Sequence, residues 1–199
     1  FKNFINITSQ ITYRIVFCNF HLLYNFSMKT TSFYIKNYCY LAEGDTPDLS
    51  FVPTIQRRKL SPLDKIALGT MSKVFTPEVE EIVFASKIGE FDRLKTIIEE
   101  YQEFGEVSPA KFSASVHNYP AGFFCLINKL NIPYFALAAG EESFKNGLIK
   151  AIISDKENVL FTHADKTAFS CIVSKTEGTK FELNEIDENF IELLKERTK

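Results

Sequence analysis

Hydrophobic positions along this chain follow two spacings. Five short apolar runs, rich in β-branched and aromatic residues, predict strands at 32–41, 81–88, 132–138, 158–163 and 168–174. Elsewhere apolar residues recur every three or four positions, which predicts helices beginning near 61, 91, 118 and 143 and a further helix near the C-terminus. Because strands and helices alternate, we expect an α/β fold with a mostly parallel central sheet and helices on both faces.

Local signals mark the ends of the predicted helices. Ser61 is a favourable N-cap, Pro62 suits the first helical position, and Asp64 supplies an acid at the third. The second helix carries an apolar stripe that makes it amphipathic, and we expect it to end near Gly105. The helix at 118–130 is apolar nearly all round, which indicates burial on both sides.

The start of the chain differs in composition from the rest. Glu43 is the first acidic residue. We expect residues 1–27 to be a non-native or disordered extension, with the native protein beginning at Met28 and residues 28–199 forming one domain. The alternative is a targeting segment, but the stretch lacks an uninterrupted apolar core and a small-residue cleavage site. It is also too polar for a membrane span of about 20 apolar residues.

Charge and cysteine usage exclude several classes of partner. A formal charge of −2 gives no reason to expect nucleic acid or an acidic membrane. The cysteines form no C-x-x-C pair, so we expect buried thiols in a reducing cytosol; they are Cys18, Cys39, Cys125 and Cys171. The histidines are too scattered for a metal site, and no phosphate-binding loop is present, so we expect no metal and no cofactor.

Four sequence blocks carry a more specific signal. They are R-R-K-L-S-P-L-D-K-I-A-L at 57–68, V-F-A-S-K-I-G-E at 83–90, F-S-A-S-V-H-N-Y-P-A-G at 112–122 and A-L-A-A-G-E-E-S-F-K-N-G-L at 136–148. In order and spacing they resemble the β-ketoacyl-synthase-like N-terminal domain of short standalone proteins, typical of aryl-polyene and related gene clusters. The resemblance implies half of a thiolase-like fold, because a full condensing enzyme contains two such halves.

The resemblance also locates a missing nucleophile. In full condensing enzymes the reactive cysteine lies between the strand matching 132–138 and the helix matching 143–153, where helix-start amides stabilise a thiolate. Gly140 and Glu141 stand there instead, and which of them replaces the cysteine stays open. Neither forms an acyl-enzyme in the usual way. The half that supplies the decarboxylating histidines has no counterpart here, so we expect no independent condensation activity.

A subunit interface is implied as well. In this family the strand before the nucleophile pairs with its counterpart across a twofold axis. The predicted interface residues are therefore Pro133, Tyr134, Phe135, Ala136 and Leu137. A bare apolar edge strand would be an aggregation hazard, which favours a partner on this strand.

Aromatic residues ahead of the turn are candidates for an acyl tunnel, since an acyl chain needs an apolar wall. The candidates are Phe112, His117, Asn118, Phe123 and Phe124. For the phenylalanines the alternative is core packing. For the other two it is a helix cap by Asn118 and a hydrogen bond from His117 to a loop carbonyl.

Three functional hypotheses follow. The leading one is a non-catalytic cytoplasmic subunit that forms a heterodimer with a full-length β-ketoacyl-ACP synthase in polyene or fatty-acid-like biosynthesis, shaping the acyl tunnel as a chain-length factor does. The alternatives are a small malonyl-ACP decarboxylase using Glu141 or His163, and a homodimer that binds acyl carrier protein. The basic run at 57–59 is a candidate contact for an acidic carrier protein, with a solvated helix entrance as the alternative.

Overall fold

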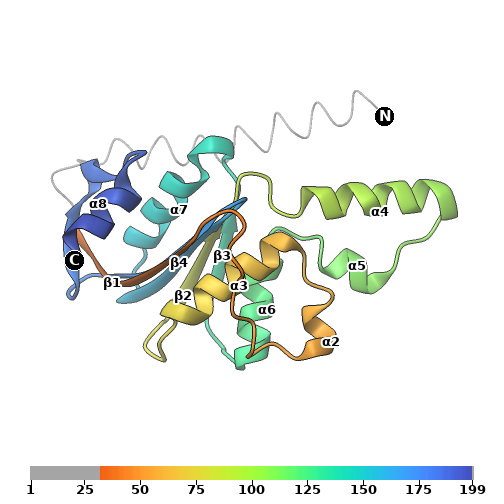
Figure 1. Cartoon of the computed structure of the whole chain (residues 1–199), viewed down its shortest axis with the longest axis horizontal. Helices are drawn as coiled ribbons and strands as arrows, with labels where there is room; N and C mark the ends of the chain where they lie inside the picture. The colour runs from red at the N-terminus through yellow and green to blue at the C-terminus, as the bar shows by residue number, and fades with distance from the viewer. Residues whose placement is uncertain (1–31, 199) are drawn as a thin grey trace. The chain divides into compact units, whose positions relative to one another are not determined.

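A six-stranded sheet forms the centre of the computed structural model, which describes residues 32–198 (Figure 1). The strand order is β3-β2-β4-β5-β1-β6, with β3 at one edge. The strands are β1 (Ser32–Leu41), β2 (Glu81–Ala85), β3 (Tyr134–Leu137), β4 (Asn158–Ala164), β5 (Ala168–Ser174) and β6 (Thr179–Glu182). Residues 1–27, expected to be an extension, lie outside the described residues.

Helices connect the strands. They are α2 (Thr54–Arg57), α3 (Pro62–Val74), α4 (Phe91–Phe104), α5 (Pro109–Ser113), α6 (Tyr119–Asn128), α7 (Ser143–Ile152) and α8 (Phe190–Arg197), with short 3-10 turns η1 (Gly140–Glu142) and η2 (Leu183–Glu185). No helix in the described part of the chain is long and apolar enough to cross a membrane.

The predicted fold class is confirmed. Strands β2, β3 and β4 are parallel neighbours, whereas β5 is antiparallel to both β4 and β1. Strand β1 therefore runs in the same direction as β4, so four of the six strands share one direction. The sheet is mostly parallel in this sense, and the antiparallel pairings gather on the side of β5, β1 and β6.

Helices cover both faces of the sheet, and each face has its own apolar core (Figure 1). Strand β2 shows the division: Ile82 and Phe84 pack toward α3 and α6, while Val83 and Ala85 pack toward α7 and α8. This alternation follows from the two-residue period of a strand. A central strand that is buried on both sides has an almost wholly apolar sequence, which is why the apolar run at 81–88 predicts a strand.

The start of α3 forms as its sequence predicts. The Ser61 hydroxyl accepts a hydrogen bond from the backbone N–H of Asp64 at 3.0 Å, and the Asp64 carboxylate accepts one from the backbone N–H of Ser61 at 2.9 Å. This reciprocal pair is a capping box, with Pro62 in the first helical position. Three short elements were not predicted: α2, α5 and β6. Helix α5 does begin with a serine and a proline, Ser108 and Pro109, but it is only five residues long.

Helix α4 begins and ends as predicted but packs differently from a core helix. It contacts α5 and lies with it to one side of the sheet (Figure 1). We call residues 90–114, which contain α4 and α5, the arm. Ile97 is the buried residue of α4, whereas Phe91 and Tyr101 are 54% and 59% exposed. The amphipathic stripe of this helix is therefore real, but most of it faces away from the core.

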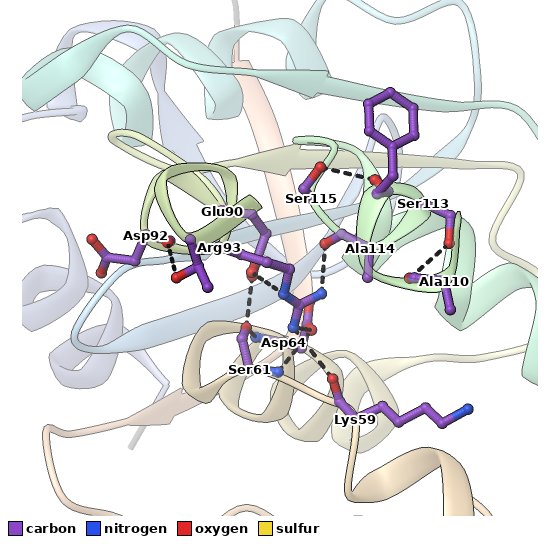
Figure 2. A network of polar contacts seen from close by, with 12 residues as sticks. Lys59, Ser61, Asp64, Glu90, Asp92, Arg93, Ala110, Ser113, Ala114 and Ser115 are labelled. Atoms are coloured by element: carbon purple, nitrogen blue, oxygen red, sulfur yellow. Dashed lines mark hydrogen bonds and ion pairs between the residues drawn. The ribbon is translucent and has the colours of Figure 1, made fainter. Parts of the chain in front are cut away.

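One guanidinium group holds the arm against α3 (Figure 2). Arg93 forms ion pairs with Asp64 at 3.0 Å and with Glu90 at 3.1 Å, and it donates to the backbone carbonyls of Ala114 and Lys59. Both carboxylates are buried, so two acids share one cation. Breaking such a buried pair is strongly destabilising, because a charge is left without its partner.

The composition of this cluster makes Asp64 hard to ionise. Burial and the neighbouring Glu90 carboxylate raise the pKa of Asp64 to about 6, against the opposing effects of the Ser61 N–H and Arg93. Its Oδ1 atom is buried and accepts no hydrogen bond from the described residues, which fits a site suited to a proton. A raised pKa means that the stabilising contribution of Asp64 is full at low pH and is lost as the pH rises through about 6.

We predict that Asp64→Asn removes a pH-dependent component of stability. Between about pH 5.5 and about pH 7.5, the free energy of unfolding of the unsubstituted protein should fall by about 1 kcal/mol more than that of the variant. Chemical denaturation at both pH values measures the difference, and titrating groups that do not interact with Asp64 cancel in the comparison. Parallel pH dependences for the two proteins would contradict the raised pKa.

Candidate functional site

The strand-to-helix turn between β3 and α7 is the predicted position of the missing nucleophile. Gly140 and Glu141 both lie in η1, directly before α7. Gly140 has a φ of 58°, a left-handed conformation that glycine adopts without strain. The turn thus has the geometry expected of it, and no cysteine of the described residues lies there: Cys39, Cys125 and Cys171 are in β1, α6 and β5.

A buried hydroxyl group fixes the turn to the end of β2. The Ser143 hydroxyl accepts a hydrogen bond from the Ala139 N–H at 2.9 Å. It also lies within donating distance of the Gly140 carbonyl, at 2.7 Å, and of the Ser86 carbonyl, at 3.1 Å. Ser143 is fully buried. The start of α7 is therefore held by a serine rather than exposed for attack on a substrate.

A second polar cluster lies at the carboxyl ends of β2 and β4. The Asp165 carboxylate accepts hydrogen bonds from the Ser86 hydroxyl at 3.0 Å and the Lys87 N–H at 2.9 Å, and it pairs with His163 Nε2 at 3.1 Å. Burial alone would raise the pKa of Asp165, but His163, the Lys87 N–H and Ser86 together hold it below its ordinary value. Asp165 is thus an ionised carboxylate whose hydrogen-bonding capacity is used within the fold.

Glu141 is engaged in a surface ion pair. Its carboxylate contacts the Lys87 ammonium group, and the two side chains are 81% and 47% exposed. The arrangement closes a chain of contacts from His163 through Asp165 and Lys87 to the turn.

His117 links two segments that are distant in sequence. Its Nε2 atom lies 2.7 Å from the Leu137 carbonyl, at the end of β3. Its ring packs directly on Gly89, where a Cβ would lie only 2.0 Å from Nδ1. Asn118 is the N-cap residue of α6 but makes no side-chain cap hydrogen bond. His117 therefore fastens the start of α6 and the 86–90 loop to the edge strand.

The remaining tunnel candidates are separated by the structure. Phe123 and Phe124 lie in α6 within the core beneath the sheet, where the Phe124 ring meets Phe51 and Phe75 edge-on. Phe112 lies in α5 and is 59% exposed. Phe123 and Phe124 are therefore core residues of the sheet face covered by α6, whereas Phe112 is an exposed residue of the arm.

The predicted interface strand lies at the edge of the sheet. Among the described residues, β3 pairs with β2 alone. Tyr134 and Phe135 are 42% and 44% exposed and project to opposite faces: the Tyr134 hydroxyl packs on Gly122 of α6, and the Phe135 ring lies 5.3 Å from the Lys150 ammonium group of α7.

The family is settled by comparison with known families. The sequence matches the family described as β-ketoacyl synthase, N-terminal domain, over residues 35–171. This chain belongs to that family. The match confirms the resemblance carried by the four sequence blocks, and no curated protein matches the chain.

Solved structures of β-ketoacyl synthases share the fold. A structure of the ketosynthase ApeO in complex with its chain length factor ApeC, from Xenorhabdus doucetiae, matches with a TM-score of 0.62 and 20% identity over 74% of this chain and 81% of that chain. The ishigamide ketosynthase/chain length factor matches with a TM-score of 0.60 and 12% identity over 73% of this chain. The match spans 63% of that second chain, less than two thirds. The likeness confirms that the chain has the fold of these ketosynthase structures.

The three cysteines among residues 32–198 are poorly suited to acyl-enzyme chemistry. Burial raises the pKa of the Cys39, Cys125 and Cys171 thiols, so each is held in its unreactive protonated form. No group of three or more metal-binding side chains among residues 32–198 is arranged to hold a metal ion.

Sequence reasoning missed the polar residues that support the turn. Ser86 and Lys87 lie at the carboxyl end of the predicted strand at 81–88, and Asp165 lies just beyond the one at 158–163. The carboxyl ends of parallel strands meet at one edge of a sheet. Because Glu141 also follows a predicted parallel strand, this rule could have predicted that these residues lie near it. Ser143 gave no such signal, because a serine in the first turn of a helix is common for local reasons.

We predict that Glu141→Cys creates a reactive thiol without creating a condensing enzyme. The Lys87 ammonium group and the start of α7 should lower the pKa of the new thiol, whereas the histidines of the described residues are held by Leu137 and Asp165. Alkylation by iodoacetamide, followed by mass spectrometry, should be faster for this variant than for Glu142→Cys. Formation of a condensation product from acyl and malonyl carrier proteins would contradict the prediction.

Proposed function

We propose that this chain is a non-catalytic ketosynthase-like subunit that forms a heterodimer with a full-length β-ketoacyl-ACP synthase. It joins the partner through β3 and helps to shape the acyl tunnel, as a chain-length factor does. The partner supplies the nucleophilic cysteine, and an acyl carrier protein delivers the substrate to the complex. The pathway is the assembly of a polyene or a fatty-acid-like chain.

The open edge of β3 is the observation that carries this proposal. The Ile82 N–H donates to the Pro133 carbonyl at 3.1 Å, and the Ser86 N–H donates to the Leu137 carbonyl at 3.2 Å. In a parallel ladder alternate residues point to alternate sides, so the backbone N–H and C=O groups of Tyr134 and Ala136 point outward. A flat, apolar edge of this kind is a template for another strand.

The chemistry of the turn supports a partner role over an independent enzyme. Glu141 is paired with Lys87, and Ser143 uses its hydroxyl group to hold the turn. The scaffold around a nucleophile is present, but the nucleophile is absent from it. A subunit that keeps the shape of the site without its chemistry is expected to act through the surface it presents to a catalytic chain.

The similar structures point in the same direction. Both are structures of a ketosynthase with a chain length factor. At 20% and 12% identity this likeness concerns the fold, so the role is a proposal for the present chain. Helix α6 lies against β3, and its largely apolar sequence would give a tunnel at this interface an apolar wall.

We predict that Tyr134→Glu prevents pairing with the full-length ketosynthase partner. Co-expression followed by size-exclusion chromatography should give one complex for the unsubstituted chain and separate elution for the variant, because a carboxylate would be buried in an apolar strand interface. Ile55→Glu is the matched control: Ile55 lies in α2, is 76% exposed, and should still co-elute.

A backbone variant tests strand pairing itself. Ala136→Pro removes an outward N–H and leaves the hydrogen bonds to β2 in place, since proline is tolerated on edge strands. A thermal unfolding midpoint near that of the unsubstituted chain would show that the fold survives. Co-elution of both variants with the ketosynthase would overturn the proposal, and a complex of two copies of this chain would favour the homodimer instead.

A further inference from the structure

The arm has few apolar contacts with the rest of the protein, which we call the body. Within the arm Glu90, Ile97 and Ala114 are buried, and the other residues are exposed or half-buried. The principal packing of α4 is with α5, which is part of the arm itself. A segment that buries so few apolar side chains is expected to open at a lower free energy than the core of the protein.

Glu90 and Arg93 make the polar contacts between the arm and the body (Figure 2). In the described part of the chain, every ion pair and hydrogen bond from the arm to the body involves one of them, apart from local bonds of Ser115 beside the end of the arm. The Ser61 hydroxyl donates to Glu90 Oε1 at 2.6 Å, and Arg93 pairs with Asp64 at 3.0 Å. A charged cluster therefore holds the arm closed.

This cluster has one more acid than it has cations. If Asp64 and Glu90 are both ionised, Arg93 balances only one of them, and a net negative charge is left in a buried site. Such a charge is costly, and one bound proton removes it. Hydrogen bonding favours Asp64 as its place. Both Glu90 oxygens have a donor, Ser61 on Oε1 and Arg93 on Oε2, whereas Asp64 Oδ1 is buried and has none among the described residues.

We propose that the arm opens from the body as one unit and that a proton held on Asp64 keeps it closed, so that the arm is released as the pH rises. Opening separates Arg93 and Glu90 from Asp64 and admits water, so the closed arm binds a proton that the open arm gives up. Burial, followed by the Glu90 charge, raises the pKa of Asp64 to about 6 in the closed arm. The advantage of the closed state is therefore full below the ordinary carboxyl pKa of about 4 and is lost as the pH rises through about 6.

Two other titratable groups lie near the cluster. Tyr119 of α6 faces it, with the Arg93 guanidinium 5.6 Å from the centre of its ring. Burial, followed by the Asp64 charge, raises the pKa of Tyr119, so this residue keeps its proton throughout the range. His117 packs on Gly89 at the base of the arm, and histidines titrate near neutral pH. Its Nε2 atom bonds to the end of β3 and not to the cluster, so an Asp64 variant leaves it unchanged.

Hydrogen exchange of the full chain, followed by mass spectrometry, measures the opening of the arm. An isolated helix of 14 residues is marginal in water, so α4 unravels once it leaves the body and its amides exchange. After correction for the intrinsic exchange rate, the protection of α4 amides should fall about tenfold between about pH 5.0 and about pH 7.5, as linkage to a pKa near 6 requires. At both pH values β5 amides should be at least about a hundredfold more protected, because the core opens only when the chain unfolds.

Asp64→Asn is the decisive variant, because asparagine carries no charge at either pH. Its α4 amides should show the same protection at both pH values, within about twofold. Glu90→Gln should reduce the response of α4 to pH, since it leaves one acid for one cation. The matched control is Asp92→Asn, which should keep the response of about tenfold. Asp92 is an exposed acid in the first turn of α4, and its carboxylate points away from the cluster (Figure 2).

Four results would overturn the inference. If α4 amides are as protected as β5 amides, the arm opens only when the whole chain unfolds. If α4 exchanges rapidly without any response to pH, the cluster does not hold the arm. A full response in Asp64→Asn would assign it to another group such as His117, and a full response in Glu90→Gln would contradict the balance of two acids against one cation. None of these results bears on the pairing of β3 with a ketosynthase, which Tyr134→Glu tests separately.

Discussion

Backbone groups at the edge of a sheet need hydrogen-bond partners, and among residues 32–198 the outer side of β3 has none from a neighbouring strand. Strand β3 has β2 on one side and presents the N–H and C=O groups of Tyr134 and Ala136 on the other. Two contacts hold β3 in place: Tyr134 packs on Gly122 of α6, and His117 lies within hydrogen-bond distance of the Leu137 carbonyl. An edge that is short, apolar and rigid loses little conformational entropy when a second strand joins it.

The arm depends on a different kind of constraint. Arg93 satisfies two buried carboxylates and two backbone carbonyls at once, so the position of α4 is determined by charge rather than by apolar packing. Such a cluster costs desolvation and adds little net stability compared with an apolar substitute. Its contribution is to orient α4. The planar guanidinium of Arg93 binds its partners in only a few geometries, so α4 exposes the apolar residues from Phe91 to Tyr101 without packing them onto the core.

The sequence predicted what local rules determine. The capping box of Ser61 and Asp64, the end of α4 at Gly105 and the buried strands at 81–85 and 168–174 follow from residues that are close together in the chain. Strand β6 was missed because its place is set by pairing with β1, far away in sequence. Hydrophobic periodicity also predicted α4 correctly, but it gives no information on what covers the apolar side of a helix.

The turn at Gly140 and Glu141 was predictable from local sequence only in part. Its position was predictable from the family blocks, but the serine that holds it was not, because the Ser143 hydroxyl bonds to the Ser86 carbonyl from another strand. The same long-range contact explains why the turn keeps its shape without a nucleophile. A loop that had lost all function would be free to lose its support, whereas here the hydrogen bonds of Ser143, Asp165 and His117 all hold segments that meet at the end of β3. The polar residues around the turn at Gly140 and Glu141 therefore stabilise the end of the edge strand, which the proposed function places at the interface with a partner.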